Sequence, residues 1–539
     1  MGAEDAAARR GLRGRGRGDD RRRPPGSEHA MNAWTGGHVR DETGIVLHGD
    51  PVRSAVPVER LVGLALRRNP RRVHLLVSTV LAKHVPTPPA LALAAGHVLG
   101  GYVAARLDDA APDPRPAELL AAALDPDERT TGADEGRFDA LRAATAATPR
   151  DRPDVRVIGY AETATGLGHL VAEALGARYL HSTRHVPAPG APAIGFEEEH
   201  SHATSHVLSP VDDDWLVADG TVVLVDDEIS TGTTVINTVR EMHAVRPQRH
   251  WVVASLIDLR SAADRARVDA LAAELGTRID VVALGVGTVH LPDDVRERAE
   301  RLIGAPSQPS GAEDAVAVVG AEAVLGDAGV AGGVSDGGET DDAGATSDVV
   351  DVEVDVRPIR SARFGVEGTV EPAVVRRIAD AIDPVAGDGS VLVLGSEEFI
   401  ALPVHVADAL RAPGRAVRFS TTTRSPIAPV DRDDYAIAGA IRFRSHDETV
   451  DGPGERFAYN LTRGGRRFDT IVFMPEPGLP AGALDAAEGV VAALRRVTAR
   501  VVVVHTPAWH PPVVDERGPR DRPLGASGHP DTSIPERTR

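Results

Sequence analysis

Residues 222 to 234 read VVLVDDEISTGTT, and this stretch decides the fold. Four apolar residues that favour strands come first, and Asp226 and Asp227 follow at the carboxyl end of the predicted strand. A turn over Ser230 to Gly232 leads into a predicted helix with apolar residues on one face. Open α/β sheets bind ligands at the carboxyl ends of their strands, so this stretch predicts a ligand site.

The residue types in this turn favour a phosphate group. Ser230, Thr231, Gly232, Thr233 and Thr234 let backbone N–H groups converge at the amino end of a helix. The two carboxylates before the turn would repel a phosphate unless they bound hydroxyl groups or faced a cationic carbon. A ribose ring offers both, because its hydroxyls bind carboxylates and its anomeric carbon becomes positive when a leaving group departs. A strand followed by a capped helix with surface acids is the alternative that needs no ligand.

Strands alternate with amphipathic helices on both sides of this stretch. Strands are predicted at 155–160, 177–180, 221–225, 251–257 and 279–284, and helices at 170–175, 235–243 and 262–275. A second region repeats the pattern, with strands at 391–394, 416–419, 470–473 and 500–504 and helices at 401–410 and 484–497. Such alternation predicts α/β folds with largely parallel sheets.

The motif DDxxxTGxT, carried by Asp226, Asp227, Thr231, Gly232 and Thr234, resembles the site at which type I phosphoribosyltransferases bind 5-phosphoribosyl-1-pyrophosphate (PRPP). The resemblance, to orotate phosphoribosyltransferase-like enzymes, implies a parallel sheet flanked by helices with a small hood. It also implies that Ser230 to Thr234 hold the 5-phosphate and that Mg²⁺ accompanies the pyrophosphate, held mainly through PRPP and without a direct protein site.

A second loop fits the same family. Residues 155 to 168 have the strand, loop and helix order of the family's pyrophosphate loop, with Ala161, Glu162 and Thr163 at the turn. Arg184, just after the next predicted strand, is a candidate to neutralise pyrophosphate. Asp258 and Arg260 follow a further strand and are candidates to line the pocket of the acceptor base.

Residues 196 to 206, FEEEHSHATSH, occupy the position of the mobile loop that closes over PRPP in orotate-type enzymes. That loop carries a catalytic lysine in the family, and this one has none. His202 is the candidate for proton transfer, with His200 and His206 beside it. A metal site made by these three histidines and a solvated loop without chemistry are the alternatives.

Lys83 is the one lysine in a chain whose other basic residues are arginines. A compact ammonium at this position would suit pyrophosphate better than a planar guanidinium. Chance survival of a single lysine is the alternative.

Thr421 to Ile427, TTTRSPI, resemble the signature of the TRSP domain, which follows an orotate phosphoribosyltransferase-like domain in proteins linked to tellurium-resistance gene clusters. Two loops at predicted strand ends form a candidate pocket in this second domain. Its residues are Ser396, Glu397, Thr423, Arg424 and Ser425, with Arg444, His446 and Asp447 as further candidates. Hydroxyls with arginine suit an anion, but a capped helix and surface salt bridges explain the same residues equally well.

Composition limits the class of protein. The 539-residue chain has a formal net charge of -19 and no cysteine, which argues against nucleic-acid binding and excludes disulfides and thiolate chemistry. We find no apolar run of about 18 residues and no signal peptide, and therefore expect a cytoplasmic protein without a membrane partner. We expect disorder at 1–30, a phosphoribosyltransferase-like domain at 31–305, a flexible acidic linker at 306–350, a TRSP-like α/β domain at 351–515 and a disordered tail at 516–539.

These features favour an enzyme that uses PRPP and magnesium to ribosylate a base-like acceptor with release of pyrophosphate. The alternative is a regulatory protein that senses PRPP without turning it over. The missing loop lysine favours the regulator, and the intact acid pair favours the enzyme. Partners are expected to be PRPP, a small-molecule acceptor, a second copy in a homodimer, and other enzymes of the same gene cluster.

Limited proteolysis tests the domain boundaries. Because residues 306 to 350 are rich in Gly, Ala and acids, we expect the first cut there, leaving two folded fragments. A single resistant core that includes this stretch would contradict the two-domain reading.

Overall fold

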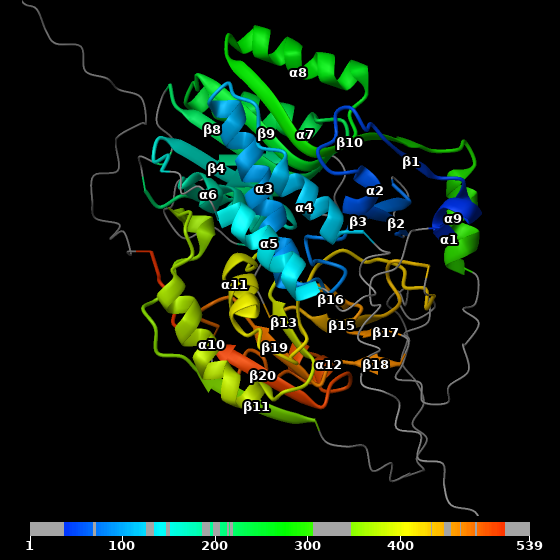
Figure 1. Ribbon diagram of the computed structural model, residues 1–539, viewed down its shortest axis with the longest axis vertical. Coiled ribbons are helices and arrows are strands. Elements are labelled where there is room, and N and C mark those ends of the chain that lie inside the picture. Colours follow the sequence, from blue (N-terminus) through cyan, green and yellow to red (C-terminus); the bar gives the residue numbers. More distant parts are fainter. Residues whose placement is uncertain are drawn as a thin grey trace, which may run out of the picture.

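A computed structural model describes residues 37–67, 72–125, 134–146, 151–185, 194–197, 205–212, 215, 219–304, 347–432, 434–446, 454–463, 465–479 and 482–511. Figure 1 shows two sheets, one above the other, with helices around each. The chain forms two successive α/β regions with largely parallel sheets, as the sequence predicts.

The first sheet has seven strands in the order β1-β10-β9-β8-β4-β5-β12. They are β1 (Val46–Gly49), β4 (Val155–Gly159), β5 (Arg178–His181), β8 (Thr221–Ile229), β9 (His250–Asp258), β10 (Arg278–His290) and β12 (Val366–Glu367). The five central strands are parallel, whereas β1 and β12 are antiparallel edges. β12 comes from beyond residue 350, so the second region supplies one edge of the first sheet.

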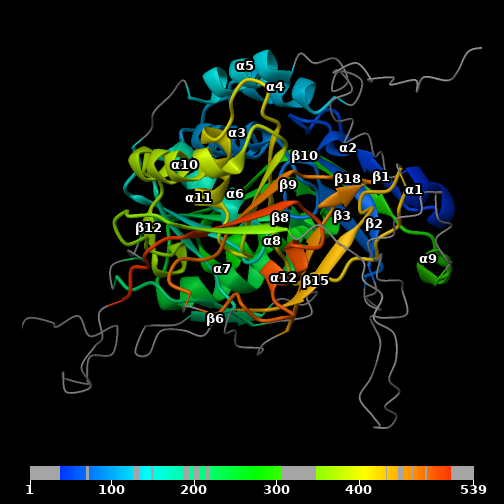
Figure 2. The same cartoon turned by 90° about the horizontal axis from the view of Figure 1, so that it is seen from below.

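Helices cover both faces of this sheet. The helices of the first domain are α1 (Gly37–Thr43), α2 (Val58–Leu61), α3 (Pro89–Leu107), α4 (Arg115–Ala123), α5 (Asp134–Ala146), α6 (Ala164–Leu175), α7 (Thr233–Val245), α8 (Ala262–Leu275) and α9 (Val295–Gly304). Figure 2 shows α3 on one side of the sheet and α7 on the other. The alternating apolar residues of β8 explain this, because Val223 and Val225 join one core cluster and Val222 and Leu224 the other.

Two hairpins complete the first domain: β2 (Val62–Leu66) with β3 (His74–Ser78), and β6 (Ile194–Glu197) with β7 (Ser205–Leu208). Neither hairpin is predicted from the sequence.

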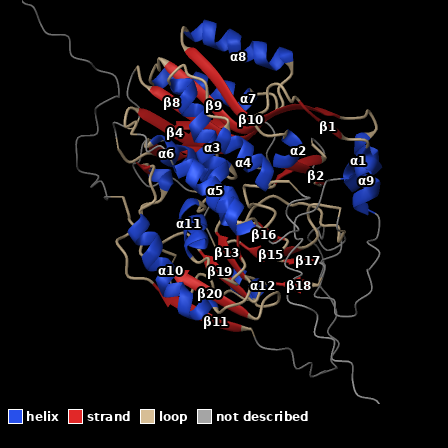
Figure 3. Ribbon diagram, viewed as in Figure 1, coloured by secondary structure: helices blue, strands red, loops and turns tan. Residues whose placement is uncertain are grey.

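The second sheet has five parallel strands in the order β11-β20-β19-β13-β14. They are β11 (Asp348–Glu353), β13 (Val391–Gly395), β14 (Val417–Thr421), β19 (Thr470–Met474) and β20 (Arg500–His505). α10 (Pro372–Ala386) and α11 (Ala401–Ala409) pack on one face, and α12 (Val490–Leu494) on the other. The short helix η2 (Ala362–Phe364) precedes β12. Figure 3 shows short strands beside this sheet: β15 (Ala440–Arg444), β16 (Glu455–Tyr459), β17 (Thr462–Arg463) and β18 (Arg466–Arg467).

One predicted helix is too long, and several helices are missing from the prediction. The helix predicted at 484–497 is only α12, because Gly489 takes an extended conformation immediately before it. Among the missing helices is α3. It is long and apolar enough to cross a membrane by length and composition, although no apolar run of about 18 residues is expected from the sequence. Most of α3 is buried in the core of the first domain, where it packs on α6 and α5.

The two domains share one core and several backbone contacts. α11 packs against α3 and α6, and Tyr435, Phe457 and Tyr459 join the core cluster of the first domain. Thr87 and Phe419 exchange backbone hydrogen bonds of 2.9 Å across the interface. The segment that carries Lys83 is thereby held by the second domain.

Candidate active site

The turn after β8 has a left-handed residue directly before a helix. Gly232 is the residue before α7 and has a φ of 77°, a left-handed conformation that glycine adopts without strain. Ser230, Thr231 and Thr233 are partly exposed around it. Arg267 of α8 donates to the Thr233 hydroxyl over 3.3 Å, so a cation already lies beside the turn. The contact of Arg267 with this turn is not predicted from the sequence, because Arg267 lies 33 residues beyond Thr234 on another helix.

Asp258, at the end of β9, and Arg260, just after it, support this turn. Arg260 contacts both carboxylate oxygens of Asp258 at 2.9 and 3.0 Å, and both residues are buried. A Cβ on Gly232 would lie 3.3 Å from the Arg260 side chain. Arg260 therefore lies against the turn at 230–234, and the side chains of Asp258 and Arg260 pair with each other.

Asp226 and Asp227 lie near the carboxyl end of β8, as predicted. The backbone N–H of Asp227 donates to Asp226 over 2.9 Å. Burial raises the pKa of Asp227, and the neighbouring Glu228 raises it further, while the Lys83 ammonium acts in the opposite direction. Lys83 therefore acts electrostatically on Asp227, although it comes from the segment after β3.

The side chain of Lys83 also contacts the predicted pyrophosphate loop. Its ammonium donates to the Thr163 hydroxyl over 2.7 Å and lies 3.1 Å from a carboxylate oxygen of Glu162. The peptide bond between Ala161 and Glu162 is cis. The structure thus brings together three parts of the sequence that the analysis treats separately: the Lys83 segment, the loop at 161–163 and the acid pair.

The second domain reaches the same loop. The Thr423 hydroxyl donates to one carboxylate oxygen of Glu162 over 3.1 Å, and the Arg424 backbone N–H donates to the other over 3.3 Å. Burial opposes ionisation of Glu162, but Lys83, Arg424 and Arg184 together lower its pKa. Three cations thus act electrostatically on one buried carboxylate at the predicted pyrophosphate position.

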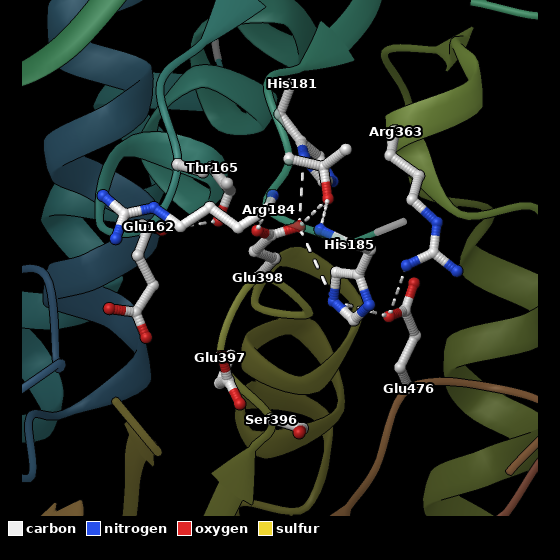
Figure 4. A network of polar contacts seen from close by, with 12 residues as sticks. Glu162, Thr165, His181, Arg184, His185, Arg363, Ser396, Glu397, Glu398 and Glu476 are labelled. Atoms are coloured by element: carbon white, nitrogen blue, oxygen red, sulfur yellow. Dashed lines mark hydrogen bonds and ion pairs between the residues drawn. The ribbon is translucent and has the colours of Figure 1, made fainter. Parts of the chain in front are cut away.

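The loop after β13 carries two glutamates, Glu397 and Glu398, that contact the second and the first domain, respectively. Glu397 is buried and pairs with Arg424 over 2.7 Å and with Arg456. Glu398 points the other way, into the first domain, where it accepts from the Thr183 hydroxyl over 2.7 Å and from the Arg184 backbone N–H over 3.1 Å (Figure 4). The candidate pocket of the second domain and the candidate site of the first therefore meet at one interface.

The remaining candidate residues have no contact with Lys83 or Glu162 among the described interactions, or lie outside the described residues. Ser396 contacts His446 over 3.3 Å, and the backbone N–H of Ser425 donates to the Thr423 hydroxyl over 3.1 Å. Arg444 is exposed at the end of β15. His200, His202 and Asp447 lie outside the described residues, and of His206 only the backbone is described, in β7. Within the described parts of the chain, no group of three His, Asp or Glu side chains could hold a metal ion.

Family profiles match both domains. A profile described as phosphoribosyl transferase matches residues 61–288, and one described as the TRSP domain C-terminal to that transferase matches residues 360–494. The comparison with curated proteins gives no match.

Similar solved structures include adenine phosphoribosyltransferases. That of Rhodothermus marinus is 19% identical over 24% of this chain and 69% of its own, with a TM-score of 0.19. That of Trypanosoma brucei, in complex with AMP, pyrophosphate and ribose-5-phosphate, is 15% identical over 32% of this chain and 68% of its own, with a TM-score of 0.19. That of Giardia lamblia, complexed with 9-deazaadenine, is 17% identical over 30% of this chain and 84% of its own, with a TM-score of 0.19.

The contacts of Lys83 generate a prediction. Lys83→Arg keeps the positive charge beside Glu162, but a planar guanidinium does not match the position of an ammonium 2.7 Å from Thr163. We expect weaker binding of PRPP and of pyrophosphate by calorimetry, by roughly tenfold or about 1.4 kcal/mol, with little change in melting temperature. Wild-type affinity in this variant would contradict a role for Lys83 in binding pyrophosphate and would favour its chance retention.

Proposed function

This chain combines a phosphoribosyltransferase-family domain at 61–288 with a TRSP domain at 360–494, and we propose that it transfers the phosphoribosyl group of PRPP to a nitrogen acceptor with release of pyrophosphate. The observation that carries the proposal is the position of Lys83. Its ammonium lies 3.1 Å from Glu162 on the candidate pyrophosphate loop and acts electrostatically on Asp227 of the candidate ribose site.

Each part of PRPP has a chemically suitable place in this arrangement. The 5-phosphate fits the backbone N–H groups of Ser230 to Thr234, with Arg267 beside them. The ribose hydroxyls fit Asp226 and Asp227. The pyrophosphate fits the cations that now surround Glu162, namely Lys83, Arg184 and Arg424.

The reaction follows from these positions. The bond between C1 of the ribose and pyrophosphate breaks, and pyrophosphate leaves with the electron pair. The carboxylates of Asp226 and Asp227 stabilise the positive charge that develops on the ring. The acceptor nitrogen then forms a bond to C1 and loses a proton. His202 is our candidate to receive that proton, on its place in the sequence alone.

Magnesium fits this chemistry. Hard oxygen ligands suit Mg²⁺, and PRPP itself would supply most of them. When bound with PRPP, the ion would neutralise the charge of the departing pyrophosphate.

A PRPP sensor without turnover is the second candidate. The observation that favours it is the state of Glu162, a carboxylate that already pairs with the cations intended for pyrophosphate. A binding protein could use this competition to set its affinity, with PRPP displacing Glu162. The acid pair has no role in the sensor beyond holding hydroxyls.

Replacing the acid pair separates the two candidates. Asp226→Asn with Asp227→Asn keeps size and most hydrogen bonding but removes the negative charge. An enzyme should lose about 3 to 4 kcal/mol of transition-state stabilisation, on the order of a hundredfold to a thousandfold in rate, and much less PRPP affinity. The rate is measured as release of pyrophosphate from PRPP in the presence of magnesium and a small-molecule cell extract.

The exposed Asp293→Asn is the matched control and should behave as wild type. A wild-type protein that binds PRPP but releases no pyrophosphate under these conditions would favour the sensor. Equal PRPP binding by wild type and by variants of Ser230 to Thr234 would contradict both candidates.

A further inference from the structure

The second sheet has an expected ligand position, and the first domain occupies it. The next two strands of this sheet after β13, which are β14 and β19, lie on opposite sides of β13. Open α/β sheets bind ligands at the carboxyl ends of strands where the order reverses in this way. The loops at those ends carry Glu398, after β13, and Glu476, after β19. His185 of the first domain lies between them, 3.9 Å from Glu398 and 3.6 Å from Glu476 (Figure 4).

The segment that fills this position is the loop at 181–185, which follows β5. Glu398 holds it by two hydrogen bonds. One carboxylate oxygen accepts from the Thr183 hydroxyl over 2.7 Å, and the other accepts from the Arg184 backbone N–H over 3.1 Å. Thr183, Arg184 and Glu398 are all buried. A carboxylate of the second domain therefore fixes the backbone of the first domain at Arg184.

Glu398 is charged in this setting. Burial opposes its ionisation, but His185 and His181 lower its pKa to about 2, and the hydrogen bonds from Thr183 and Arg184 act in the same direction. Hydrogen bonds to an ionised carboxylate are roughly twice as strong as those between neutral groups. The loop at 181–185 is therefore held firmly at this point.

The same loop contacts the candidate pyrophosphate loop on its other side. The Ser182 hydroxyl accepts from the Ala161 backbone N–H over 2.9 Å. In Figure 4 the Arg184 side chain extends toward Glu162, whereas His185 lies on the other side of Glu398. Burial opposes ionisation of Glu162, and Arg184 is one of the three cations that lower its pKa. The guanidinium of Arg184 thus acts on the pyrophosphate loop, while its backbone is held by Glu398.

We propose that Glu398 is a positioning residue for pyrophosphate: it holds the backbone of Arg184 so that the guanidinium faces the pyrophosphate loop. Glu398 does not bind pyrophosphate itself, because two negative groups would repel each other. The second domain serves the reaction of the first, and the strand ends of β13 and β19 receive the loop at 181–185 in place of a ligand. This inference rests on the function proposed above.

Binding of pyrophosphate, PRPP and ribose 5-phosphate to the full chain, measured by calorimetry with magnesium, tests the inference. Ribose 5-phosphate carries the sugar and the 5-phosphate but no pyrophosphate. Glu398→Met keeps the length of the side chain but removes both acceptors, so Thr183 and the Arg184 N–H lose their partner. We expect binding of pyrophosphate and of PRPP to weaken about tenfold, or about 1.4 kcal/mol, and the affinity for ribose 5-phosphate to stay unchanged.

Three further variants control this measurement, and melting curves establish that each is folded. Glu398→Gln keeps an acceptor oxygen and should recover part of the lost affinity. Thr183→Val removes the hydroxyl that donates to Glu398 and should cause a smaller loss with the same selectivity, so the test does not depend on the folding of one variant. Glu353→Met changes an exposed glutamate of β11 in the same domain and should match wild type.

A double-mutant cycle separates positioning from a general structural role. If Glu398 acts through Arg184, the variant with both Glu398→Met and Arg184→Gln should bind pyrophosphate as weakly as Arg184→Gln alone. The inference is overturned if wild type binds PRPP and both Glu398→Met and Thr183→Val keep wild-type affinity for pyrophosphate. It is also overturned if they lose ribose 5-phosphate to the same extent, or if the two losses in the cycle add. A wild-type protein that binds neither PRPP nor pyrophosphate would overturn the proposed function, and the inference with it.

Discussion

The buried carboxylate of Glu162 is the constraint on which the rest of the arrangement depends. A charge of this kind costs several kcal/mol to bury unless it is paired and hydrogen-bonded. Lys83 of the first domain and Thr423 and Arg424 of the second satisfy it together. Neither domain supplies all of these contacts, so both domains hold the loop at 161–163 in this form. β12 also joins the two domains, because it comes from the second region and pairs with β5 at the edge of the first sheet.

Much of the first domain could be predicted from sequence, because its signals are local. The run from Val222 to Thr234 carries its strand, acids, turn and helix start in consecutive residues, and β8 and α7 form where these signals place them. β4, β9, β10 and α8 follow the same logic of apolar periodicity. The family match at 61–288 agrees with the motif. The roles of the site residues and of magnesium remain predictions.

Contacts between distant segments could not be predicted in this way. Periodicity shows which face of an element is apolar, but it does not show that Thr423 contacts Glu162, 261 residues away. From the sequence, this one interface is therefore predicted as two separate pockets, and the contact of Lys83 with Glu162 is not predicted. α3 was overlooked because small residues make its apolar face inconspicuous. The contact of Glu398 with Thr183 likewise joins the two domains, and no local pattern indicates it.

The most direct test of a shared site is the affinity for PRPP, with magnesium, of Arg424→Gln compared with Arg444→Gln. Arg424 contacts Glu397 at the interface, whereas Arg444 is exposed on β15 of the same domain. If both domains build the pyrophosphate site, Arg424→Gln should weaken binding by roughly tenfold or more, Arg424→Lys should restore part of it, and Arg444→Gln should match wild type. A folded Arg424→Gln variant that binds PRPP as tightly as wild type would contradict the account.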